Sequence, residues 1–270
     1  EGVVIGVTPF EWDVRVSSKE DPGGHADVYW PGSLHHSTGH YSELETDVSA
    51  VSPYAGGGGG STLGHRVATS YLADMLLGHG RPETDRLPVV RVAFQTNPTD
   101  AVDDLRVEAT DGDASVVVHV AARRSPRFVQ SHKKTATLVG SLLEQIDQFD
   151  DDERGYVAVA VAGMTPALRQ VQGLASLARD NASEGAFHSQ VHEPGRHAGL
   201  ADRYKHLAAL ARIARPTTPA SQLRTLVWSL LCRLWVVDFR VESGDETDWA
   251  AISNRLAPPR QSRNRRRCVA

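Results

Sequence analysis

The stretch that decides the fold is Arg91–Arg124, RVAFQTNPTDAVDDLRVEATDGDASVVVHVAARR. Three runs rich in β-branched and alternating apolar residues lie within this stretch or overlap its start, at 89–95, 102–109 and 115–121. Turn-forming residues separate the runs at Asn97-Pro98 and at Asp111-Gly112-Asp113. The pattern predicts three consecutive strands joined by short connections.

Helical and strand patterns flank this predicted meander on both sides. Before it, large apolar residues recur at helical spacing over 63–78, and after it they do so over about 128–149. The apolar run YVAVAVA at 156–162 is typical of a strand covered on both faces, which predicts a central position in a sheet. The order helix, three strands, helix, buried strand predicts an α/β core over 61–164.

The sequence beyond this core is mainly helical. Thr165-Pro166 opens a predicted helix to about 179, and two more are predicted from 199 or 200 to 213 and from 219 or 220 to 234. A late strand is predicted over 235–242 and a short amphipathic helix over 248–256. Residues 165–257 are therefore expected to form a mainly helical extension packed on the core.

The two ends of the chain lack a core-forming pattern. Residues 1–60 are dense in Gly, Ser, Pro, Asp and His and finish in five glycines at 56–60, which predicts a disordered or loosely attached segment with a flexible linker. Residues 258–270 are expected to form a disordered basic tail, because 260–270 hold five arginines and no acids. The chain before that tail has 24 Lys and Arg against 33 Asp and Glu, a net charge of −9.

Composition excludes several classes of protein. No apolar run approaches the ~20 residues that span a bilayer, and the first residues do not resemble a signal peptide, so we expect a cytoplasmic protein with no membrane partner. Two cysteines provide neither a disulfide framework nor a metal-binding CxxC. The sequence also contains no GxxxxGK[ST] phosphate-binding loop and no GxSxG nucleophile motif.

Two neighbouring carboxylates stand near the start of the middle predicted strand. Asp103 and Asp104 would point to opposite faces, so only one of them can enter a given site. Alternation places Asp104 on the face of Arg106 and Glu108. We take Asp104 as the candidate metal-site carboxylate, with a solvated strand end as the alternative.

The next predicted strand places His119 and Ala121 on one face, followed on that face by Arg123. A nuclease-type metal site needs an acid or amide at the first of these positions and a lysine at the second, to hold Mg²⁺ and stabilise charge. His119 can ligate a metal, whereas Ala121 can neither donate a proton nor stabilise charge. Arg123 could provide a cation but not a general base. The candidate catalytic residues are Asp104, His119 and Arg123, and the candidate Mg²⁺ ligands are Asp104 and His119.

Several segments together resemble a known family. GHRVATSYLADMLLG, FQTNPTDAVDDLRVEA, VHVAARRSPRFVQSHKKT, YVAVAVAG, LASLARDN and FRVESGD resemble the N-terminal double-stranded DNA endonuclease domain of CD-NTase-associated and related bacterial anti-phage effectors, over about 61–256. The resemblance implies a restriction-endonuclease-like PD-(D/E)XK fold and a role in antiviral defence. Only Asp104, or Asp103, carries over as a metal-site carboxylate, because the acid-x-Lys of the family falls on His119 and Ala121.

These observations lead to three functional expectations. The first is a catalytically impaired, nuclease-like defence module that binds DNA or a partner protein. The second is an active, divergent Mg²⁺-dependent endonuclease in which His119, Arg123 or Lys133-Lys134 replaces the missing groups, with Asp74 as a further acid that could converge with Asp104 and His119. The third is a structural or interaction remnant of a larger defence protein. The partners to expect are double-stranded DNA and a separate sensor or NTPase subunit, and oligomerisation is left open.

Overall fold

The computed structural model describes residues 4–8, 11–15, 58–96, 100–150, 154–193, 198–240 and 247–256. In this part of the chain, one five-stranded mixed sheet has the strand order β3-β4-β5-β6-β7. The fold is therefore α/β, as predicted. The predicted tail at 258–270 lies outside the described residues.

The three predicted strands of the meander are confirmed. They are β3 (Val89–Phe94), β4 (Leu105–Thr110) and β5 (Ser115–Ala122). β3 pairs antiparallel with β4, and β4 pairs antiparallel with β5, with Arg106 opposite His119. Asp103 and Asp104 lie just before β4, although their carbonyl oxygens still accept hydrogen bonds from Thr96 and Gln95 at the end of β3.

The other two strands run parallel to β5. β6 (Gly155–Val161) lies between β5 and β7 (Leu234–Asp238), which confirms its predicted central position. Its residues alternate between the two faces of the sheet, and its last five are fully buried. Because β7 follows the helices of 165–233, the sequence beyond residue 164 completes the same sheet.

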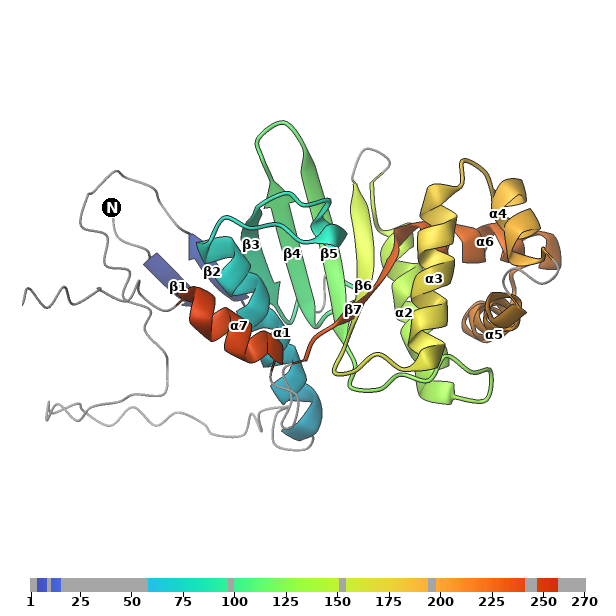
Figure 1. Cartoon of the computed structure of the whole chain (residues 1–270), viewed down its shortest axis with the longest axis horizontal. Coiled ribbons are helices and arrows are strands. Elements are labelled where there is room, and N and C mark those ends of the chain that lie inside the picture. The colour runs from blue at the N-terminus through green and yellow to red at the C-terminus, as the bar shows by residue number, and fades with distance from the viewer. Residues whose placement is uncertain are drawn as a thin grey trace, which may run out of the picture.

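Helices cover both faces of the sheet (Figure 1). α1 (Gly58–Leu76) packs on one face, against apolar residues that include Leu105, Val107 and Val118. On the other face lie α2 (Lys133–Asp147), α3 (Pro166–Asp180), α5 (Ala198–Ala214) and α6 (Ala220–Arg233), around a core that includes Val157 and Val159. The described elements also include the 3₁₀ turn η2 (Pro82–Thr84) and the helices α4 (Glu184–Val191) and α7 (Thr247–Leu256).

Several boundaries differ from the sequence expectation. α1 begins at Gly58, inside the predicted glycine linker, and two strands within the segment expected to lack structure, β1 (Val4–Thr8) and β2 (Glu11–Arg15), pair antiparallel. α2 begins at Lys133 rather than near 128, because 127–132 fold into two tight turns first. Among the described residues, each helix is too short or too polar to traverse a lipid bilayer.

Candidate functional site

Asp104 and Arg123 come together where β4 begins and β5 ends. Oδ2 of Asp104 accepts a hydrogen bond from the backbone N–H of Ala122 over 2.8 Å and forms an ion pair with the Arg123 guanidinium. Burial raises the pKa of Asp104, while Arg123 and the Ala122 N–H oppose that rise. The carboxylate is thus held by a cation and an amide of its own chain.

His119 lies on the sheet face that α2 covers, and only 3% of the residue is exposed. Its Nε2 lies 3.4 Å from the amide nitrogen of Gln145 on α2, and its ring lies against that of Phe149 at a centroid distance of 5.6 Å. Gln145 also accepts a hydrogen bond from the N–H of Val102 over 3.1 Å. The side chain of Gln145 therefore contacts both the segment before β4 and the ring of His119.

The second ring nitrogen of His119 points toward a buried carboxylate. Its Nδ1 lies 3.6 Å from Oδ2 of Asp100, slightly beyond hydrogen-bonding distance. Burial lowers the pKa of His119 to about 4, Asp100 opposes that change, and the nearby guanidinium of Arg106 adds to it. His119 is consequently neutral at pH 7 and packed in the interior.

The arrangement does not fit a magnesium site. Mg²⁺ prefers octahedral oxygen ligands and is usually held by carboxylates. The carboxylate of Asp104 is already paired with the Arg123 guanidinium, whose positive charge would repel a metal ion. Ala121, at the position where the nuclease pattern has lysine, is an apolar core residue. In the described part of the chain, no three His, Cys, Asp or Glu residues gather closely enough to hold a metal ion.

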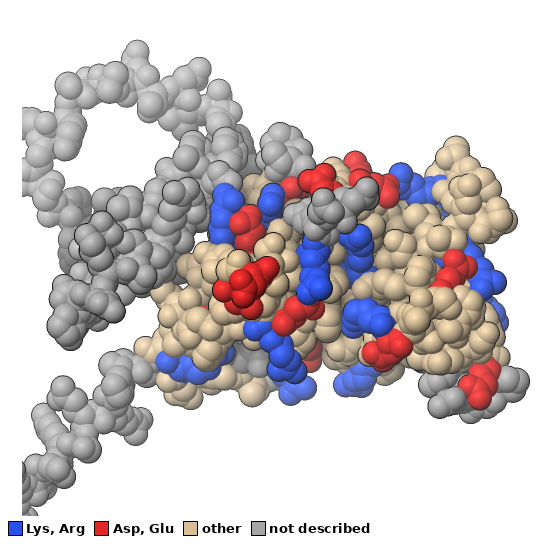
Figure 2. Space-filling model, turned by 90° about the horizontal axis from the view of Figure 1, so that it is seen from above, with Lys and Arg blue, Asp and Glu red and all other residues tan. Residues whose placement is uncertain are grey.

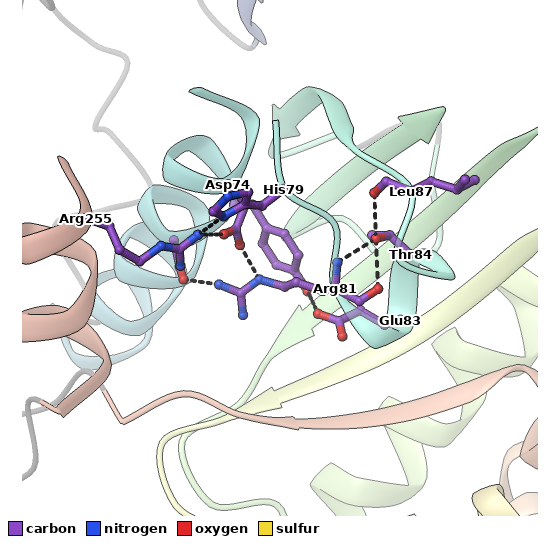
Figure 3. A network of polar contacts seen from close by, with 9 residues as sticks. Asp74, His79, Arg81, Glu83, Thr84, Leu87 and Arg255 are labelled. Atoms are coloured by element: carbon purple, nitrogen blue, oxygen red, sulfur yellow. Dashed lines mark hydrogen bonds and ion pairs between the residues drawn. The ribbon is translucent and has the colours of Figure 1, made fainter. Parts of the chain in front are cut away.

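Asp74, the acid whose convergence with Asp104 and His119 would favour an active site, is engaged elsewhere. It lies on α1, which covers the opposite sheet face from α2, and it is 3% exposed. Its carboxylate pairs with Arg81 and, over 2.7 Å, with Arg255 of α7 (Figure 3). Asp74 therefore does not converge with Asp104 and His119. Its carboxylate instead connects α1 to Arg81 and to α7.

A buried network that no local sequence pattern predicts surrounds Asp74. Tyr71 donates a hydrogen bond to Glu83 over 2.7 Å, and Arg81 lies over the rings of Tyr71 and Phe239, 4.9 Å from each centroid. Burial, followed by the Glu83 carboxylate, raises the pKa of Tyr71. These residues come from α1, η2, the end of β7 and α7, with no periodic spacing, so sequence reasoning had no signal that could have found them.

No protein-family model, no curated protein and no solved structure matches the chain. The functional conclusion therefore depends on the site itself and on the order of its elements.

Proposed function

We propose that this chain carries a restriction-endonuclease-like core from a bacterial anti-phage defence system, and that it acts in the cytoplasm by binding DNA or a partner protein rather than by cutting DNA. The observation that carries the proposal is the combination of α1, the β3-β4-β5 meander, α2 and β6 in this order, with Asp104 at the start of β4. This order is the one expected of a restriction-endonuclease-like core, and Asp104 is the residue that the sequence resemblance assigns to its metal-site aspartate.

The loss of cleavage follows from the chemistry of three positions. Asp104 is paired with Arg123, His119 is buried against Gln145, and Ala121 is apolar. A hydrolytic nuclease needs a metal-held water and a cation that stabilises the charge developing on phosphorus. An arginine that remains protonated can stabilise charge but cannot take the proton from water.

A cleavage assay tests this proposal. We expect the purified full chain to leave supercoiled plasmid intact in Mg²⁺ and in Mn²⁺. Nicking or linearisation that disappears in Asp104→Ala but persists in Asp202→Ala would overturn the proposed impairment. Asp202 is a suitable control because it is an exposed aspartate on α5 that pairs only with Lys205 in the described structure.

The alternative is an active, divergent endonuclease that uses Mg²⁺. It is favoured by two exposed lysines, Lys133 and Lys134, at the start of the following helix. Under this alternative, cleavage would be metal-dependent and lost in Lys133→Gln or Lys134→Gln. A chain that neither cuts nor binds DNA would leave two possibilities: binding of a partner protein such as a separate sensor or NTPase subunit, or the third expectation, a structural or interaction remnant of a larger defence protein.

A further inference from the structure

One exposed segment next to Asp104 carries charge of a single sign. We call Arg123–Lys134, RRSPRFVQSHKK, the basic loop; it joins the end of β5 to the first turn of α2. It contains five Lys and Arg, and no Asp or Glu occurs anywhere from 114 to 143. This local excess of positive charge contrasts with a body whose net charge is negative.

Three of the five cations of the basic loop are available to a ligand. Arg127, Lys133 and Lys134 are exposed, and none of the three forms an ion pair with another residue in the described ranges. Lysines in the first turn of a helix also weaken that helix, because the helix dipole is positive at this end. The stability of α2 therefore does not explain their placement.

The loop is anchored to the fold near its middle. The ring of Phe128 is buried in the core beneath α2, and the backbone oxygen of Phe128 accepts a hydrogen bond from Arg203 of α5 over 2.5 Å. Hydrogen bonds from Val129 to Arg127 and from His132 to Val129 close two successive turns. Cations on an anchored loop lose less conformational freedom on binding than cations on a free one.

Charge elsewhere on the molecule is arranged differently. Figure 2 shows acidic and basic side chains interspersed over the end of the molecule that lies uppermost in Figure 1. A surface with both signs attracts phosphates weakly, whereas neighbouring cations of one sign neutralise successive phosphates and release the counterions that cover DNA. The basic loop is therefore better suited to a polyanion than the surface in Figure 2.

We propose that the basic loop is a contact surface for the phosphate backbone of double-stranded DNA, with Arg127, Lys133 and Lys134 as its phosphate-binding side chains. The inference rests on the proposed nuclease-like function, because it places DNA beside the Asp104–Arg123 pair. Recognition is sequence-independent, since these side chains meet phosphates and not bases.

Fluorescence anisotropy with a labelled duplex of mixed sequence tests the proposal. We expect the full chain to bind with an affinity that falls steeply between about 50 and 200 mM salt. Lys133→Gln/Lys134→Gln should weaken binding on the order of tenfold and reduce the log–log salt slope by about one per lysine. Arg127→Gln should act in the same direction.

A matched control variant distinguishes a specific contribution of the basic loop from the general effect of removing positive charge. Arg86→Gln/Arg212→Gln removes the same charge from two exposed arginines outside the basic loop, and it should leave affinity and salt slope nearly unchanged. Unaltered melting temperatures would show that each variant is folded. Equal losses in both double variants, or no wild-type binding at low salt, would overturn the basic loop as a DNA surface. The cleavage assay reports separately on the proposed impairment, so the two proposals can fail independently.

Discussion

His119 is kept neutral by its surroundings. Its pKa lies at about 4, chiefly because the ring is buried, whereas a histidine in the unfolded chain titrates near 6.5. Between these two values the unfolded state binds the proton and the folded state does not. The contribution of His119 to stability is therefore complete above about pH 6.5 and is lost as the pH falls toward 4.

We predict that the free energy of unfolding decreases from pH 7 to about pH 4.5, and that it decreases less in His119→Gln. The share due to this residue is at most about 3 kcal/mol, because each unit of pKa difference corresponds to about 1.4 kcal/mol. Urea unfolding of both proteins at several pH values measures it. If the two pH dependences ran parallel, His119 would not be the group that titrates.

At the scale of elements, one carboxylate of α1 holds two arginines. One arginine comes from α7 and the other from the segment that leads into η2. Asp74 pairs with both Arg81 and Arg255, and the side chain of Asp74 is 4% exposed while that of Arg255 is 37% exposed. Loss of Asp74 would leave the more buried Arg81 without its ion-pair partner. Loss of Arg255 would leave the Arg81 pair in place.

We predict that Asp74→Ala destabilises the protein by about 3–5 kcal/mol, the usual effect of breaking a buried ion pair. Arg255→Ala should cost under about 1 kcal/mol, because the lost pair is screened by solvent. Chemical denaturation of the two variants provides the comparison. Comparable losses would mean that α7, and not Arg81, holds the carboxylate of Asp74.

At the scale of the whole molecule, the two hydrophobic cores share one sheet. In β6, Val157 and Val159 face the core under α2, while Ala158 and Ala160 face the core under α1. Because β6 contributes side chains to both cores, disruption of the sheet would expose both cores to water. We therefore expect the described α/β unit to unfold cooperatively.

We predict that Leu142→Ala in α2 and Leu63→Ala in α1 lower the same unfolding transition, each by about 2–5 kcal/mol. The two leucines form a matched pair, because each is almost fully buried and they lie in different cores. Thermal unfolding followed by circular dichroism and by intrinsic fluorescence checks this. Two separated transitions, of which each variant shifts only one, would show that the cores are independent.

Much of the fold could be predicted from local sequence. Alternation and turn residues located β3, β4 and β5, the YVAVAVA run located the central β6, and Thr165-Pro166 marked the start of α3. Thr165 caps that helix by accepting a hydrogen bond from the N–H of Leu168. These features were predictable because periodicity, capping and turn preferences act over a few residues.

The candidate site was predictable only as a set of residue types. The sequence by itself determined that an aspartate, a histidine, an alanine and an arginine stand at these positions of two adjacent strands. Only the tertiary structure decided that Arg123 pairs with Asp104, that Gln145 of α2 meets His119, and that Asp74 belongs to α1 packing. The physical reason is that these contacts join residues 19 to 181 positions apart, where no local pattern specifies the partner.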